Sequence, residues 1–156
     1  QKLELERRVH FLGFRRDVAQ IMKAVDLFVF PAHYEPFGLV VIEAMASGLP
    51  VITATTTGAA QIMTPESGVV LSDSEDTNAL AQAMSNLEGN CELRNQMGKV
   101  ARTIAEQHGW TSMANIYVDL FEELASYEDN RPRTHLSPHE RPGRLPGGAT
   151  KANSTG

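Results

Sequence analysis

The sequence predicts an α/β fold, a Rossmann-like parallel sheet with helices on both faces. Short apolar runs alternate with segments whose apolar residues recur at helical spacing, and the connections between them are short. Strand–helix–strand units of this kind form right-handed crossovers, so the strands are expected to be parallel. With 156 residues, 42% of them apolar, the chain can form one such domain around a buried core.

The first elements are expected between residues 9 and 30. Residues 9–12 (V-H-F-L) form a short apolar run ended by Gly13, which predicts a buried strand. Asp17 is placed to cap a helix over residues 18–25, where the apolar residues follow i, i+3, i+4, i+7 spacing. Residues 27–30 are apolar throughout, as in strands covered on both faces.

The middle of the chain continues the alternation. A helix is predicted over residues 38–47 and a strand over 50–53. A polar loop at 55–58 and one helical turn at 59–63 then lead to a fourth strand at 68–71. In this order the loops after the first three strands lie at one edge of the sheet, where open α/β sheets bind their ligands.

The last third of the ordered chain is predicted to be helical. A helix over residues 77–87 stops near Gly89, and a longer one over 92–108 stops at Gly109. Thr111 is placed to cap a final helix that carries an apolar stripe.

We expect one nucleotide-binding domain over residues 1–127 and a disordered tail over residues 128–156. The tail holds four prolines and four glycines and too few large aliphatic residues to offset the entropy of ordering. Because the chain starts at Gln1 and enters a predicted strand almost at once, we expect it to be a piece of a longer protein that lacks its N-terminal portion.

The candidate site centres on the segment E-P-F-G-L-V-V-I-E, residues 35–43. It follows a predicted strand and opens a helix, an arrangement in which free amides and the helix dipole attract phosphate. Glu43, in the second turn, is placed to accept hydrogen bonds from ribose hydroxyls, and Glu35 to meet what lies beyond the phosphates. Spacing alone leaves an even chance that both are solvated surface charges.

Other residues also carry two interpretations. Gly38 suits either a phosphate-binding turn or close packing of helix on strand, whereas Gly48 is assigned to helix capping. Phe14 could pack on a nucleobase or in the core, with similar weight.

Composition excludes several classes of function. A net charge of −5 argues against nonspecific binding of nucleic acid. One cysteine and scattered histidines offer no disulfide framework and no metal-ligand spacing, so we expect no metal and a reducing, cytoplasmic environment. No apolar run is long enough for an integral membrane segment.

The segment at 35–43 closely resembles the E-x7-E signature of the family 4 retaining glycosyltransferases of GT-B fold. Flanking segments agree in order, namely V-H-F-L-G-F at 9–14, D-L-F-V-F-P at 26–31, G-V-V-L at 68–71 and G-W-T at 109–111. The resemblance covers about residues 9–124.

The resemblance implies the C-terminal, donor-binding half of a two-domain enzyme. Glu35 would contact the transferred sugar as the catalytic residue, the amides of Phe37, Gly38 and Leu39 would hold the sugar and diphosphate, and Glu43 would bind the ribose. Gly13 and Phe14 would flank the base, and Gly58 completes the implied donor-binding residues. The implied reaction is transfer of a sugar from a nucleotide diphosphate-sugar with retention of configuration, without a metal or other cofactor.

The sequence departs from the family pattern at two places. The usual P-S-x-x-E is P-A-H-Y-E at 31–35, and the usual G-G-x-x-E is T-G-A-A-Q at 57–61. Similar replacements occur in members that resemble lipopolysaccharide-core glycosyltransferases. The Arg/Lys pair that clamps the diphosphate in the family, and the domain that would bind a glycan or lipid-linked acceptor, would both lie upstream of Gln1.

Two other functions remain open on the sequence. One is a nucleotide-binding module that has lost catalysis and serves interaction or regulation, and the other is a GT-B-type nucleotide-sugar epimerase. A cytoplasmic location is expected, with room for peripheral association with the inner face of the membrane.

Overall fold

A computed structural model describes residues 5–129 of the chain. The chain divides into two compact units, residues 1–115 and 116–156, which are described separately. The tail predicted for residues 128–156 lies outside the described residues from 130 onward, and Glu128 and Asp129 are the last residues of a helix.

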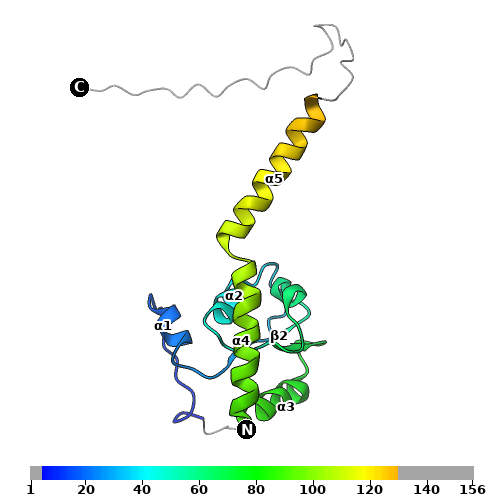
Figure 1. Ribbon diagram of the computed structural model, residues 1–156. Coiled ribbons are helices and arrows are strands. Elements are labelled where there is room, and N and C mark those ends of the chain that lie inside the picture. Colours follow the sequence, from blue (N-terminus) through cyan, green and yellow to red (C-terminus); the bar gives the residue numbers. More distant parts are fainter. Residues whose placement is uncertain (1–4, 130–156) are drawn as a thin grey trace, which may run out of the picture. The chain divides into compact units, whose positions relative to one another are not determined.

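The first unit is built on a three-stranded parallel sheet (Figure 1). Its strands are β1 (Phe28–Phe30), β2 (Val51–Ala54) and β3 (Gly68–Leu71), in the order β1-β2-β3. Phe28 pairs with Val51, and Val51 with Gly68, so the three strands start in register. The predicted parallel sheet is therefore confirmed, and the carboxyl ends of all three strands meet at one edge.

Helices cover both faces of this sheet, as predicted. Helix α2 (Leu39–Ala46) packs on the face that presents Val51, and α1 (Val18–Met22) and α4 (Cys91–Gln107) complete that layer. Helix α3 (Thr77–Glu88) packs on the opposite face, which presents Ile52. Because successive strand residues point to opposite faces, β2 is fully buried between the two layers.

Local sequence sets where these helices begin and end. The Asp76 carboxylate accepts from the amides of Asn78 and Ala79 and caps α3, and the Asn90 side chain accepts from Leu93 and caps α4. At the end of α2, Gly48 has φ +82°, and the amides of Gly48 and Leu49 bond back to the carbonyls of Met45 and Ala44. This Schellman pattern confirms the capping role predicted for Gly48.

The prediction of a strand at residues 9–12 is wrong. These residues have no strand pairing, and Phe11 is 96% exposed. An apolar run becomes a strand only when a neighbouring strand accepts its backbone hydrogen bonds. No strand within residues 5–129 pairs with this run.

The capping predicted for two helices, and the end of one of them, also differ from expectation. Helix α1 ends at Met22, before Val25, and Asp17 stands at its N-cap without capping it, because its carboxylate is held by Arg15 at 2.6 and 2.8 Å. That guanidinium lowers the pKa of Asp17. The predicted turn at 59–63 is the 3₁₀ helix η1 (Gly58–Ile62), and Thr111 lies inside α5 (Trp110–Asp129) rather than capping it.

The second unit contains the greater part of α5. Within it the rings of Tyr117 and Phe121 stack with centroids 6.3 Å apart, and the large apolar side chains are exposed. None of the helices in residues 5–129 combines the length and apolar composition that a bilayer-spanning helix requires.

The contact between α2 and α4 supplies a test of the packing. A Cβ at Gly98 would collide with the Gly48 carbonyl oxygen, so Gly98→Ala is expected to lower the free energy of unfolding by about 1–3 kcal/mol. Gly89→Ala is the matched control, because its Cβ would meet nothing closer than 3.7 Å. Urea unfolding of the two variants measures the difference, and equal stability would contradict this close packing.

Candidate functional site

Two loops are joined side by side at the carboxyl edge of the sheet. The loop after β1 and the loop after β2 meet in a parallel bridge between Glu35 and Thr57. The Glu35 amide donates to the Thr56 carbonyl at 3.2 Å, and the Gly58 amide donates to the Glu35 carbonyl at 2.8 Å. These bonds confirm that the two loops converge, as the parallel sheet predicts.

A buried hydroxyl pair supports the same loops from below. Thr53 and Thr57 are at most 1% exposed and share a hydrogen bond of 3.0 Å. The Thr53 hydroxyl also donates to the Phe30 carbonyl oxygen at 2.9 Å, at the end of β1. Buried hydroxyls satisfied in this way hold the ends of β1 and β2 together.

The Glu35 carboxylate lies on the turn that opens α2. Its Oε1 accepts from the backbone amides of Phe37 at 3.2 Å and Gly38 at 3.1 Å. The main chain of Glu35 is fixed by the neighbouring loop, so the carboxylate is held at the positive end of the helix. Two of the amides expected to bind diphosphate therefore hold this carboxylate in the structure.

Gly38 makes the turn possible. It has φ +72°, and a Cβ there would lie 2.7 Å from Thr57 Cγ2 and 3.0 Å from Ala59 Cβ. Both requirements favour glycine, the first because other residues are strained at this φ and the second because no side chain fits. Close packing therefore does require glycine at this position, but it is packing of the turn on the loop after β2 and on η1, not of helix on strand as predicted.

The next two amides of α2 have no acceptor in the described part of the chain. The N–H groups of Leu39 and Val40 donate no backbone hydrogen bond, as expected for a first helical turn. The side chains of Phe37 and Leu39 are exposed beside them. An anion at this turn would find two unpaired amides and two held by Glu35.

Glu43 faces a different part of the surface from Glu35. It lines an open cavity of about 550 Å³ between α1, α2 and α4, together with Ala46 of the same helix and its C-cap residue Ser47. Its side chain is exposed and forms no ion pair or hydrogen bond within residues 5–129.

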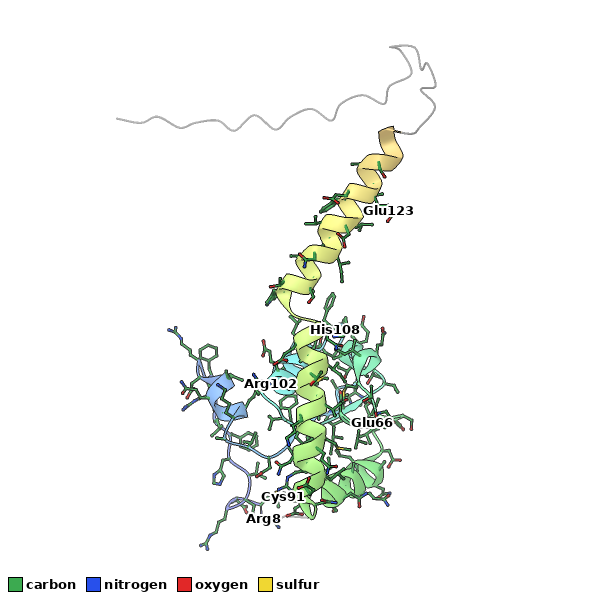
Figure 2. All side chains as sticks on the ribbon, in the orientation of Figure 1. Arg8, Glu66, Cys91, Arg102, His108 and Glu123 are labelled. Carbon is green, nitrogen blue, oxygen red and sulfur yellow. The ribbon has the colours of Figure 1, made fainter. Side chains whose placement is uncertain are left out.

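The same cavity contains cations that the sequence analysis did not assign to a site. Arg16 and Lys23, at either end of α1, and Arg102 of α4 line it with Glu43. Figure 2 shows Arg102 on the part of α4 nearest α1. Sequence order separates these residues widely, and only the packing of α1 and α4 on α2 brings them together.

The remaining predicted donor-binding residues are Gly13, Phe14 and Gly58. Gly13 has φ +64° in an open loop, and Phe14 is 88% exposed, which excludes the core interpretation of Phe14. A Cβ at Gly58 would collide with the Pro36 carbonyl, so Gly58 permits the two loops to approach. Within residues 5–129, neither Gly13 nor Phe14 forms a hydrogen bond, ion pair or ring contact with the turn at Glu35.

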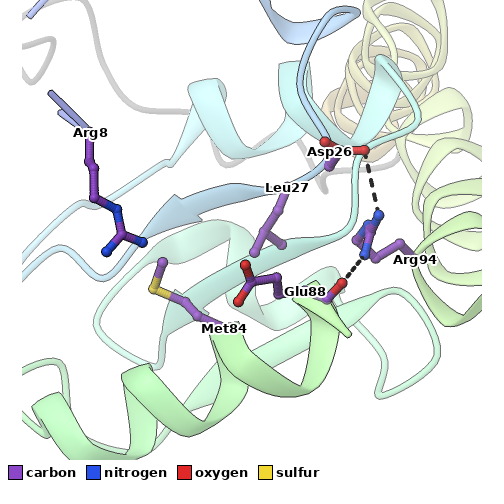
Figure 3. Close-up of a pocket in the computed structure, with 6 residues that line it drawn as sticks. All are labelled: Arg8, Asp26, Leu27, Met84, Glu88 and Arg94. Carbon is purple, nitrogen blue, oxygen red and sulfur yellow. Dashed lines mark hydrogen bonds and ion pairs between the residues drawn. The ribbon is translucent and has the colours of Figure 1, made fainter. Parts of the chain in front are cut away.

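A second cavity lies near the start of β1 (Figure 3). Arg94 dominates it, donating to the Leu87 and Glu88 carbonyls at 2.6 and 2.7 Å and pairing with Asp26 at 3.6 Å. Its charge stabilises the C-terminus of α3. We assign this cation a structural role.

The free amides and the carboxylates near α2 are of the kinds that bind anions and hydroxyl groups. Amides at the start of α2 suit phosphate oxygens, and the carboxylates suit sugar hydroxyls. Within the described residues, no group of three His, Cys, Asp or Glu side chains lies close enough to hold a metal ion.

Comparison with known proteins identifies similar chains. Residues 1–104 match the family model described as glycosyl transferases group 1. The chain is 31% identical over 110 residues to a D-inositol 3-phosphate glycosyltransferase of Paenarthrobacter aurescens, covering 70% of this chain and 27% of that protein. It is also 31% identical to the lipopolysaccharide glucosyltransferase WaaG of Escherichia coli, covering 77% and 32%.

Solved structures agree with these relatives. Sucrose-phosphate synthase from Thermosynechococcus elongatus superposes with a TM-score of 0.72 at 33% identity, covering 79% of this chain and 32% of that one. HepE of Anabaena, solved with UDP-glucose, gives 0.66 at 32% identity, covering 78% and 33%. The chain spans about a quarter to a third of the length of the relatives that it matches.

Substitution of Gly38 tests how closely the turn before α2 packs against Thr57. Gly38→Ala is expected to lower the free energy of unfolding by about 2–4 kcal/mol, from the left-handed strain and the collision with Thr57 together. Gly13→Ala has similar strain but open space, so a loss of about 1–2 kcal/mol is expected. Urea unfolding of both variants measures the difference, and equal losses would show that the close approach to Thr57 is unimportant.

Proposed function

Because the chain belongs to the glycosyl transferases group 1 family, we propose that it is the donor-binding half of a retaining glycosyltransferase that uses a uridine diphosphate sugar. An N-terminal domain outside this chain would supply the acceptor site. The complex of HepE with UDP-glucose supports uridine as the base. The length of the relatives, about three to four times the matched region, supports a second domain.

The observation that carries the proposal is the turn at residues 35–40. Its amides already hold one anionic oxygen, that of Glu35, at 3.1 and 3.2 Å. A phosphate oxygen carries the same kind of charge and accepts the same hydrogen bonds, and the helix dipole favours it in the same way. The unpaired amides of Leu39 and Val40 would add to its binding.

Glu43 would bind the ribose of the same donor. It lies one helical turn after Leu39, and its carboxylate is unpaired and accessible from the cavity. Two ribose hydroxyls can donate to one carboxylate, an arrangement used in other nucleotide-binding folds.

Glu35 would exchange its partners when the donor binds. The diphosphate takes the amides of Phe37 and Gly38, and the released carboxylate accepts from hydroxyls of the transferred sugar. During transfer, negative charge develops on the departing diphosphate, and amides aimed at that charge lower the barrier. Amides and cations of the protein would supply this stabilisation without a metal.

The acceptor would be a glycan or a lipid-linked glycan held by the N-terminal domain. Resemblance to WaaG, a lipopolysaccharide glucosyltransferase, supports an acceptor of this class. A nucleotide-sugar donor would place the reaction in the cytoplasm, with peripheral attachment to the membrane carried by the other domain.

A second function is supported by one observation. Glu35 already has a structural role, because its carboxylate caps the turn before α2. If capping this turn is the only role of Glu35, the chain would be a nucleotide-binding module without catalysis. Substitution of the two acids separates these functions.

Glu43→Ala is expected to weaken binding of UDP to the chain at least tenfold, because hydrogen bonds to a charged group contribute about 1.5–3 kcal/mol. Isothermal titration calorimetry measures the affinity. Glu66→Ala, an exposed acid that does not line the cavity, is the control and should leave the affinity unchanged. Unchanged affinity in Glu43→Ala, or sugar transfer by the chain without a second domain, would contradict the proposal.

Glu35→Gln is expected to abolish sugar transfer by the full-length protein while leaving stability nearly unchanged, since the Gln carbonyl can still accept from Phe37 and Gly38. Glu35→Ala should lose transfer and also about 1 kcal/mol of stability, through loss of the cap. Glu35→Ala should bind UDP at least as tightly as the parent, because no side chain then competes for the amides of Phe37 and Gly38, and Glu35→Gln should bind UDP about as tightly as the parent. Full transfer activity in Glu35→Gln would favour the non-catalytic role of this residue.

A further inference from the structure

Thr57 is a buried residue that contacts both ends of the turn before α2. Its backbone pairs with Glu35 in the parallel bridge, and its methyl carbon Cγ2 lies 2.7 Å from the position that a Cβ on Gly38 would take. The amide of Gly38 in turn donates to the Glu35 carboxylate at 3.1 Å. A shift of Thr57 would therefore move the Glu35 main chain together with an amide that holds the Glu35 side chain.

The Thr57 hydroxyl belongs to a buried hydrogen-bonded chain whose direction can be assigned. The Thr53 hydroxyl lies 2.9 Å from the Phe30 carbonyl oxygen and 3.0 Å from the Thr57 hydroxyl. Thr53 has one hydroxyl proton, and a carbonyl oxygen can only accept, so that proton goes to Phe30. The proton between the two hydroxyls must then come from Thr57. Thr57 thus donates to Thr53, and Thr53 donates to the end of β1.

This hydrogen bond fixes the side-chain rotamer of Thr57. A threonine Cβ carries one hydroxyl and one methyl group, so holding the hydroxyl at Thr53 leaves the methyl against Gly38. Thr53 follows Val51 by two residues in β2, so its side chain points to the face of the sheet on which α2 packs. Both threonines are at most 1% exposed, so water has no access to replace the bond between them.

We propose that Thr57 is a positioning residue for sugar transfer and acts through Glu35. This inference rests on the proposed function, because it takes Glu35 as the carboxylate that contacts the transferred sugar. The hydroxyl chain ties the end of β1 to the loop after β2, and the parallel bridge joins that loop to the Glu35 backbone. A displacement of about 1 Å in a reacting group can cost about 100-fold in rate. Loss of the Thr57 hydroxyl should thus slow transfer while the donor still binds.

The test uses the full-length protein with UDP-glucose, the nucleotide sugar solved with HepE, as donor and water as acceptor. This reaction breaks the bond between the sugar and the diphosphate and releases glucose and UDP. Thr57→Val keeps the branched shape, and the Thr53 proton keeps its acceptor at Phe30, so the variant should fold. It is expected to lower kcat for UDP release about tenfold and to change KM for UDP-glucose by less than about twofold.

Two further variants separate positioning from stability. Thr57→Ser keeps the hydroxyl and should restore kcat to within about threefold of the parent. Ser67→Ala is the matched control, because Ser67 is a fully buried hydroxyl that bonds to Thr64, in the turn before β3. It should lower the midpoint of urea unfolding at least as much as Thr57→Val does and leave kcat unchanged.

Three results would overturn the positioning role while leaving the proposed function intact. The first is an unchanged kcat in Thr57→Val, with or without a higher KM. The second is a kcat in Thr57→Ser as low as in Thr57→Val, which would exclude the hydroxyl as the cause. The third is an equal loss of kcat in Ser67→Ala, which would show that the effect follows stability. If the parent releases no UDP from UDP-glucose, the proposed function fails, and this inference fails with it.

Discussion

The main-chain pairing of Glu35 with the loop after β2 is the constraint on which the site depends. Hydrogen bonds of 3.2 Å to Thr56 and 2.8 Å from Gly58 fix the backbone before α2, and the side chain then reaches the helix amides. Gly58 and Gly38 are required because the two segments approach too closely for a Cβ. The same hydrogen bonds thus set both the start of the helix and the position of the candidate catalytic carboxylate.

Packing on the other side of α2 forms the cavity that contains Glu43. The absence of a side chain at Gly98 lets α4 approach the end of α2, and α1 approaches the same end, where Met22 lies 3.9 Å from the Ser47 hydroxyl. These contacts place Glu43 of α2, Arg102 of α4 and two cations that flank α1 around one cavity.

Much of this organisation could be predicted from local patterns. The mostly apolar runs at residues 28–30, 51–54 and 68–71 form strands, as predicted, and both faces of their sheet are covered. Helical periodicity located α2, α3 and α4 to within a residue or two, and Gly48 ended α2 as predicted. The apolar run at 9–12 failed as a strand because strand formation requires a partner, which no local pattern encodes.

The sequence by itself determined the parallel sheet, the glycine that opens α2 and the two acids eight positions apart, because period, backbone φ and spacing are local properties. Only the tertiary structure decided that Glu35 bonds to the amides of its own turn, that Glu43 faces a separate cavity, and that Arg16 and Lys23 share that cavity. Those facts depend on which side chains meet after helices pack. Contacts between residues distant in sequence follow from packing, which periodicity along the chain does not specify.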